Sequence, residues 1–474
     1  MNVSFLQELL NSVAEQGRQL LPWGSGEQED ILTLSRALMT GRGEASGVAI
    51  AQQILERWRA LQPSERQAFY TFLADGLSPD PRTVQERARA YLTTPTPDAL
   101  STLQRAVESP RQEFFRRLNL APGATSAIVE LRRDVLRLLP DFPEYRLVDA
   151  DLRHLLASWF NRGFLVLRRI DWNTPAVILE KIIAYEAVHE IKGWDDLRRR
   201  LEPADRRCFA FFHPSLVDEP LIFVEVALTA DMPAAIAPLL AVPAGKGKQP
   251  APTTAAFYSI SNCQAGLRGI SFGNFLIKQV VEELARDLPS LTTFVTLSPV
   301  PGFARWLARG LSQGDTSIVS DQERAVLAGL GGDAWTTAET MEARIKPPLL
   351  GLAAKYFLGG KSEDGRPLDP VARFHLGNGA RLERINWPAD RSARGLREAH
   401  GLMVNYLYDL KEIEANHEAY ANEGKVVASR GVRALAKSPD RMPVTQRLLN
   451  VALDTSSGKS EPATPPRAEP PRRA

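Results

Sequence analysis

One segment near the middle of the chain constrains the fold more than any other. It reads as a strand, a turn with glycines, an amphipathic helix and a second strand in direct succession. The strands are predicted at residues 254–261 and 291–298, and the turn at 264–274. The helix begins after the turn and ends before Pro289. One apolar stripe follows its length: Leu276, Ile277, Val280, Val281, Leu284 and Leu288.

The turn at 264–274 places free backbone N–H groups and the positive end of a helix dipole beneath whatever lies above it. A pyrophosphate suits that position. Gly266, Gly269 and Gly273 let the backbone approach phosphates closely, and Lys278 adds a positive charge one turn into the helix. Glycines before helices are common, however, so spacing alone supports a tight turn without a ligand equally well.

Ser298 is predicted at the C-terminal end of the second strand, and Pro299 and Pro301 break the strand after it. Open sheets usually present ligand-binding side chains at such ends. Position alone nevertheless favours a simpler interpretation, in which Ser298 caps the short helix that follows.

The first third of the chain reads as helical. Ile31, Leu34 and Leu38 repeat at helical spacing, and a break at Pro95–Asp98 leads into a new helix. No clear alternating strand precedes about residue 160. This pattern is typical of a packing or oligomerisation module.

Strand character begins after residue 160. Residues 163–170 are predicted as a strand, and Thr174–Pro175 as the cap and first position of a helix. Two apolar runs at 208–212 and 221–228 are predicted to form a hairpin. Residues 232–253 are rich in proline, glycine and alanine, which indicates an exposed, partly flexible connection.

Composition excludes several classes of protein. The chain has 474 residues, which predicts two or more domains, and its net charge is +2. Residues 455–474 alone contribute +2, so the remaining body is close to neutral and offers no footprint for nucleic acid. The proline-rich composition of this tail also predicts disorder.

Cys208 and Cys263 are the only cysteines, so we expect no disulfide framework and a reducing compartment. Two distant cysteines and six scattered histidines also argue against a structural zinc site. No apolar run approaches the roughly 20 residues that span a bilayer. We expect neither a signal peptide nor a peroxisomal address, and therefore a cytoplasmic protein without membrane partners.

The turn at 268–273 looks like the acyl-CoA pyrophosphate loop of the GNAT acetyltransferase fold, with Ser271 where that pattern usually has glycine. A closer likeness is carried by five stretches, with two more in agreement. The five are Phe257–Ser261, Gly273–Lys278, Leu297–Phe303, Phe374–Ala380 and Arg384–Trp387, and the two are Glu186–His189 and Gly401–Tyr406. Together they resemble the malonyl-CoA decarboxylase family. The likeness is strong from about residue 150 to 410 and only general across the helical N-terminal part.

The resemblance implies an α+β, multi-domain architecture. An all-α helical oligomerisation domain is expected at 1–155, followed at 156–454 by an acetyltransferase-like α/β catalytic domain with a central mixed sheet. The tail at 455–474 completes the chain. The implied reaction converts malonyl-CoA to acetyl-CoA and carbon dioxide without a metal or an organic cofactor. A homo-oligomer, dimer or tetramer, is also implied.

By motif, the family's catalytic serine and histidine correspond to Ser298 and His375. A lone histidine is more often structural, but Gly377–Gly379 predicts a tight turn beside this one. Asn386 and Tyr408 are polar residues predicted to line the pocket. The CoA-binding loop corresponds to Arg268, Gly269, Ile270, Ser271, Phe272, Gly273 and Asn274. Some family members carry an acidic residue at the position of Ser271, which puts a carboxylate role there in doubt.

These residue types suit decarboxylation, because loss of carbon dioxide from a malonyl thioester leaves an enolate that needs hydrogen-bond donors. Ser298 can donate to the carboxylate or the enolate, and His375 can orient the substrate and supply a proton to carbon. A water held by the pair would serve equally as the proton donor. Two alternatives stay open: an acyl-CoA-dependent N-acyltransferase, and a non-enzymatic CoA-sensing scaffold.

Overall fold

The computed structural model describes residues 12–13, 15–17, 29–40, 43–241, 251–270, 276–312, 319–331 and 339–437. The chain divides into two compact units, one of residues 1–233 and 239–295 and the other of 234–238 and 296–474. This division differs from the expected domain boundary near residue 155, which stays a prediction. The predicted tail at 455–474 lies outside the described residues.

The first unit begins with helices, and no described residue before Val166 lies in a strand, as the sequence predicted. Ile31, Leu34 and Leu38 are buried in the first of these helices. The predicted break also holds, because Thr96 caps a new helix that starts at Pro97. The helices are α2 (Ile31–Met39), α3 (Glu44–Ala60), α4 (Pro63–Thr71), η1 (Phe72–Gly76), α5 (Pro81–Thr93), α6 (Pro97–Val107), α7 (Pro110–Leu118), α8 (Ala124–Leu138), η2 (Pro143–Tyr145) and α9 (Arg146–Trp159).

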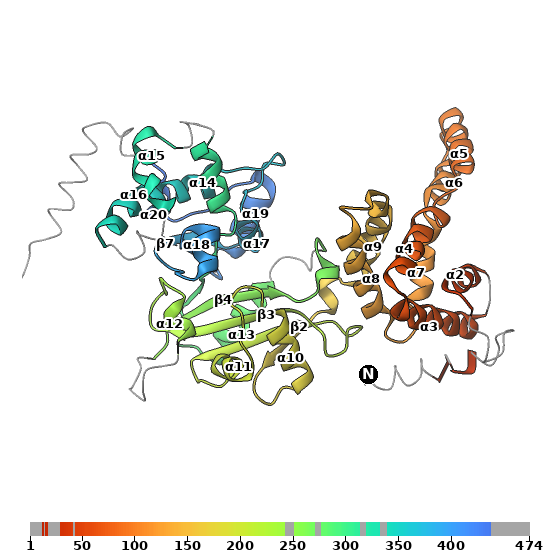
Figure 1. Ribbon diagram of the computed structural model, residues 1–474, viewed down its shortest axis with the longest axis horizontal. Coiled ribbons are helices and arrows are strands. Elements are labelled where there is room, and N and C mark those ends of the chain that lie inside the picture. Colours follow the sequence, from red (N-terminus) through yellow and green to blue (C-terminus); the bar gives the residue numbers. More distant parts are fainter. Residues whose placement is uncertain are drawn as a thin grey trace, which may run out of the picture. The chain divides into compact units, whose positions relative to one another are not determined.

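A sheet follows in the same unit, with successive strands side by side (Figure 1). The first four strands pair antiparallel, so the predicted hairpin is confirmed as β2 and β3. Helices α10 and α11 bury apolar side chains such as Ile182 and Leu197 in one cluster with Cys208 and Phe212 of β2. The elements are η3 (Arg162–Phe164), β1 (Val166–Ile170), α10 (Ala176–Tyr185), α11 (Trp194–Leu201), β2 (Arg206–Phe212), β3 (Pro220–Thr229), α12 (Ala237–Leu240), β4 (Thr254–Asn262), η4 (Ala265–Leu267), α13 (Leu276–Asp287) and β5 (Thr293–Thr296).

Two local predictions need correction. Pro175, not Thr174, is the N-cap of α10, because the Thr174 hydroxyl accepts the Asp171 N–H at 3.0 Å instead. Within the predicted exposed connection, Ile236 and Leu239 are buried, and α12 forms there. Apolar burial at these two positions outweighs the proline-rich composition.

In the second unit, strand β8 pairs antiparallel with both β6 and β7. The elements are β6 (Ser298–Pro299), α14 (Phe303–Ser312), α15 (Asp321–Leu327), η5 (Ala328–Gly331), α16 (Glu339–Gly359), α17 (Pro370–Gly377), β7 (Arg381–Asn386), α18 (Ala393–Ala399), β8 (Met403–Leu407), α19 (Ile413–Glu423) and α20 (Arg430–Leu435). The structure confirms two parts of the predicted architecture, the helical first part and the mixed sheet with helices that follows it. The acetyltransferase likeness stays a prediction.

The strand predicted at 291–298 is interrupted, so Ser298 opens β6 rather than closing β5. The cause is at Thr296. Its carbonyl accepts the Asn405 side-chain amide at 2.7 Å, and its hydroxyl accepts the Tyr406 N–H at 3.1 Å. Both bonds involve a side chain at the point where the strand is interrupted. Among the described helices, none is long and apolar enough to cross a membrane.

Candidate active site

Ser298 and His375 meet in the second unit although 77 residues separate them along the chain. The Ser298 hydroxyl oxygen lies 3.1 Å from Nε2 of His375. Both side chains are buried, with exposed fractions of 6% and 2%. A serine and a histidine in hydrogen-bond contact can donate, accept and transfer protons at one point.

Helix α17 positions His375. Asp369 caps the helix by accepting the N–H groups of Val371 and Ala372 at 2.9 Å each, and Pro370 occupies the first helical position. His375 lies in the last turn, and Asn378 ends the helix. The predicted tight turn therefore exists as a helix C-terminus.

Gly379, which follows, has a φ of +81°, and a Cβ there would lie 2.2 Å from the Ile413 carbonyl oxygen. Only glycine fits this close approach of two backbones. The turn after His375 is thereby fixed against the start of α19.

Strand β6 positions Ser298, which pairs with Val404 of β8. The Ser298 hydroxyl donates to the Thr296 hydroxyl oxygen at 2.8 Å. A serine hydroxyl has one proton. With that proton directed at Thr296, the contact between Ser298 and His375 is made by the Nε2–H of the imidazole.

The other side of the imidazole faces two tyrosines. The Tyr408 hydroxyl lies 2.8 Å from Nδ1 of His375, and the Tyr406 ring stacks on the imidazole with centroids 4.5 Å apart. Burial lowers the pKa of His375 to about 3. The imidazole is therefore neutral near pH 7, and Nδ1 accepts from Tyr408 when Nε2 carries the proton.

Asn386 is buried one step farther from the pair. Its side-chain amide donates to Asn405 Oδ1 at 2.8 Å, and Asn405 in turn donates to the Thr296 carbonyl at 2.7 Å. A chain of buried polar groups thus runs from Asn386 through Asn405 to Thr296, whose hydroxyl contacts Ser298. Of the two predicted pocket residues, Tyr408 touches His375 directly and Asn386 joins through this chain.

Asp369 links the segments that carry the serine and the histidine. It is 1% exposed, and burial raises the pKa of its carboxyl to about 6, against the lowering effect of N–H donors that include Gly302. Gly302 follows Ser298 by four residues, and a Cβ on it would lie 2.3 Å from the Tyr356 hydroxyl. The Tyr356 hydroxyl itself lies 3.4 Å from Asp369.

The predicted CoA loop lies in the first unit and is only partly described. Arg268 and Gly269 are exposed, Ile270 is buried, and Gly269 has a φ of +78°. Ser271, Phe272, Gly273 and Asn274 lie outside the described residues. Helix α13 begins at Leu276, as predicted for the helix that follows the turn.

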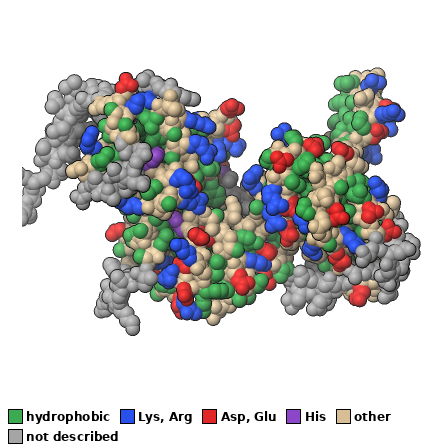
Figure 2. Space-filling view, in the orientation of Figure 1, with side chains coloured by type: hydrophobic (Ala, Val, Ile, Leu, Met, Phe, Trp, Pro, Cys, Tyr) green, Lys and Arg blue, Asp and Glu red, His purple; other side chains and the backbone are tan. Residues whose placement is uncertain are grey.

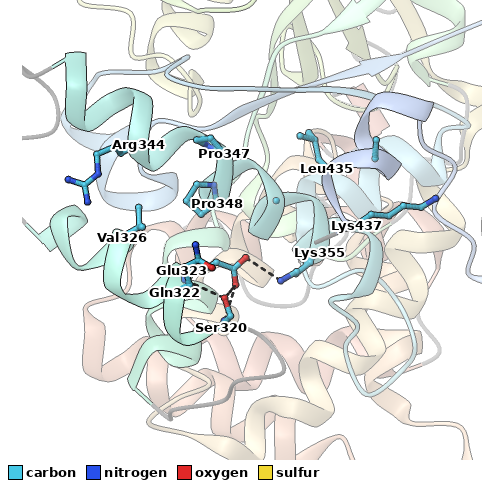
Figure 3. Close-up of a pocket in the computed structure, with 12 residues that line it drawn as sticks. Ser320, Gln322, Glu323, Val326, Arg344, Pro347, Pro348, Lys355, Leu435 and Lys437 are labelled. Atoms are coloured by element: carbon cyan, nitrogen blue, oxygen red, sulfur yellow. Dashed lines mark hydrogen bonds and ion pairs between the residues drawn. The ribbon is translucent and has the colours of Figure 1, made fainter. Parts of the chain in front are cut away.

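A separate pocket of 470 Å³ lies between α15, α16 and α20 (Figure 3). None of its lining residues is a predicted site residue. The Glu323 carboxylate in this pocket accepts a hydrogen bond from the Ser320 hydroxyl and forms an ion pair with Lys355 at 3.4 Å. Arg344 and Lys437 point away from the pocket. We therefore do not assign it to the reaction. In the described part of the chain, no group of three metal-binding side chains is present either.

Comparison with known proteins identifies the family of the chain. The family model of the malonyl-CoA decarboxylase C-terminal domain matches residues 163–446, and that of the N-terminal domain matches 77–160. The chain belongs to the malonyl-CoA decarboxylase family. Its activity is that of a carboxy-lyase acting on malonyl-CoA.

Solved structures and curated proteins support the same family. The malonyl-CoA decarboxylase structure from Rhodopseudomonas palustris is 55% identical, with a TM-score of 0.82, and the match covers 85% of this chain and 98% of that one. The structure from Cupriavidus metallidurans is 36% identical, with a TM-score of 0.66, over 90% and 100% of the two chains. The mitochondrial malonyl-CoA decarboxylase of Anser anser anser is 37% identical, over 73% of this chain and 70% of that protein.

Sequence reasoning missed several residues of this candidate site. Thr296 stands two positions before Ser298 in an alternating segment, a spacing that places both side chains on one face. Asp369 precedes Pro370, which is a common helix-start signal. Asn405 and Tyr406 had no comparable local signal.

Proposed function

We propose that Ser298 and His375 carry out the decarboxylation of malonyl-CoA in this chain, and that Arg268–Asn274 bind the pyrophosphate of the coenzyme. The buried 3.1 Å contact between Ser298 and His375 carries the first part of this proposal. The strand–turn–helix order and the exposed Arg268 support the second.

When the thioester binds, the Ser298 hydroxyl turns from Thr296 to the substrate, while Nε2–H of His375 continues to donate to the Ser298 oxygen. The pair thus presents one neutral O–H donor to the substrate. As the carbon–carbon bond breaks, its electron pair moves into the thioester and carbon dioxide leaves. Negative charge thus shifts from the carboxylate to the enolate oxygen, where the O–H group of Ser298, supported by the N–H of His375, stabilises it. With its pKa at about 3, His375 adds no positive charge that would hold the carboxylate in its ground state.

The α-carbon then takes one proton. We assign this proton to the Ser298–His375 pair, which regains it from solvent after each turnover. The Tyr408 hydroxyl at Nδ1 holds the tautomer in which Nε2 carries a proton. Tyr408 is therefore a positioning residue for the imidazole.

The first experiment incubates the purified protein with malonyl-CoA alone and follows acetyl-CoA and carbon dioxide. Release of both without an amine excludes the acyltransferase alternative, which needs an acceptor.

Ser298→Ala and His375→Ala should each lower kcat by about 100-fold or more while CoA binding survives. Ser362→Ala, at a half-buried position, and His154→Ala, at an exposed position, are the matched controls. Unchanged turnover in both site variants would contradict the role of the pair.

We infer further that the hairpin of α5 and α6 contacts a second copy of the chain. Figure 1 shows these helices side by side, extending from the other helices of their region. Neither helix has a buried residue, and hydrophobic side chains are visible on the hairpin in Figure 2. Leu92, Leu100 and Val107 are 80%, 39% and 48% exposed. Exposed apolar groups of this kind favour a protein interface.

A cytoplasmic location is also proposed, because the cysteine content suits a reducing compartment. Among the relatives named above, the one from Anser anser anser is named as mitochondrial, whereas the two solved structures come from bacteria.

A further inference from the structure

The base of the predicted CoA loop rests on helix α8 of the helical region. A Cβ on Gly266 would lie 1.9 Å from the carbonyl oxygen of Val129 in α8, so the two backbones are in direct contact. Leu267 and Ile270, on either side of the exposed part of the loop, are buried. The loop therefore has a buried base and an exposed tip at Arg268 and Gly269.

Arg132 fixes this contact through its side chain. Its Nη1 donates to the Gly266 carbonyl at 2.7 Å, and its Nε pairs with Asp149 of α9 at 2.8 Å. Arg132 is only 2% exposed, whereas Asp149 is 21% exposed. A buried guanidinium is strongly disfavoured unless it is paired and hydrogen-bonded. One side chain therefore joins α8, α9 and the first residues of the loop.

Further positive charge lies near Arg132. Burial lowers the pKa of the Arg132 guanidinium, Asp149 opposes this effect, and the charges of Arg153 and Arg268 add to the lowering. Arg153 and Arg268 are both exposed. Cations from the helical region and from the loop thus influence the same buried group.

The consequence for binding follows from preorganisation. Backbone N–H groups bind a phosphate well only if they are held in place before the ligand arrives, because ordering a loop during binding weakens affinity. The bond from Arg132 holds the Gly266 carbonyl two residues before Arg268. Removing that bond releases the loop without removing any group that touches the substrate.

We propose that Arg132 of the helical region is a positioning residue for the coenzyme A loop, so that the helical region sets the affinity for malonyl-CoA. This inference rests on the proposed function, because it takes the loop at 268–274 as the CoA site. The coenzyme is bound equally before and during carbon–carbon cleavage. A loosened loop should therefore raise KM and leave kcat nearly unchanged.

The test compares Arg132→Met with the wild-type full-length protein. We expect KM for malonyl-CoA and the dissociation constant for free CoA to rise roughly 10- to 100-fold, the usual effect of losing a hydrogen bond to a charged group. We expect kcat to stay within about twofold. Arg132→Lys, which keeps the charge beside Asp149, should recover part of the affinity.

Arg66→Met is the matched control, because Arg66 pairs with Asp134 of the same helix at 2.7 Å. It should change thermal stability without changing KM. The proposal is overturned if Arg132→Met leaves KM and CoA affinity within twofold of the wild type. It is equally overturned if Arg66→Met raises KM as much, since a general loss of stability would then explain both results.

Gly266→Ala tests the same contact if Arg132→Met does not fold. The added methyl group meets the Val129 carbonyl, so the loop base must shift and KM should rise while Arg132 keeps its charge partner. Gly47→Ala is its control, since a Cβ at Gly47 meets nothing within 4 Å. An unchanged KM in Gly266→Ala would contradict the proposal.

Absence of carbon dioxide release by the wild type would instead contradict the proposed function, and CoA titrations would still report on Arg132.

Discussion

At the scale of single residues, the protonation state of His375 decides what the site can do. Burial lowers the pKa of His375 to about 3, against about 6.5 for an exposed histidine. Between these values the unfolded chain binds a proton that the folded chain does not, so this group costs stability as the pH falls through that window. At pH 6 to 8 the imidazole is neutral throughout, and its tautomer depends on its hydrogen bonds.

Tyr408→Phe removes the hydroxyl at Nδ1 and keeps the ring. A net hydrogen-bond contribution of about 1 kcal/mol predicts a fall in kcat of roughly fivefold to tenfold with KM nearly unchanged. Steady-state rates from pH 6 to 8 test this, and the wild-type kcat should show no inflection near 6.5. Tyr420→Phe is the control, because the Tyr420 ring lies near Gly377, two residues after His375. Equal kcat values for wild type and Tyr408→Phe would contradict the positioning role.

At the scale of elements, the cap of α17 joins both halves of the site. Asp369→Ala leaves the N–H groups of Val371 and Ala372 without their acceptor, and it removes the carboxylate that the Gly302 N–H contacts. We expect the free energy of unfolding to fall by about 1–2 kcal/mol, and kcat to fall about tenfold or more because α17 carries His375. Thermal melting and rate measurements check both effects.

Asp80→Ala provides a matched control for that change. Asp80 caps α5 in the same way, accepting the N–H groups of Arg82 and Thr83, and Pro81 follows it as Pro370 follows Asp369. Its loss should weaken a helix that is distant in sequence from the site and leave kcat unchanged. Equal losses of kcat in both variants would refute a specific role of Asp369.

The elements also show how far sequence reasoning reached. Ser298 and His375 were identified by motif, and their contact across 77 residues agrees with the expected pairing. The break between β5 and β6 was not predicted, because it depends on bonds from Thr296 to Asn405 and Tyr406, more than 100 positions away. Periodicity reports which face a residue occupies, but it cannot report a partner that only the tertiary fold supplies.

At the scale of the whole molecule, we propose that the helical region has two surfaces with different roles. Its face at α8 supports the loop through Arg132 and Gly266, and the hairpin of α5 and α6 leaves apolar side chains exposed. Helices in monomeric proteins gain most of their stability by burying an apolar face. We therefore propose that the hairpin, which has no buried residue, is stabilised by assembly, and we expect association and folding of the hairpin to be coupled.

Leu92→Asp tests this expectation, since Leu92, at 80%, is the most exposed large apolar side chain among the residues that the structure describes. Burying one leucine contributes about 1.5–3 kcal/mol, and a symmetric interface uses the residue twice. A buried aspartate without a partner also opposes association. Sedimentation velocity should therefore show a dimer or tetramer for the wild type, and an equilibrium shifted toward smaller species by about 100-fold or more for the variant.

Val217→Asp, at a 44% exposed position between β2 and β3, should keep the wild-type mass. A monomeric wild type, or equal masses for all three proteins, would show that the hairpin does not join copies of this chain.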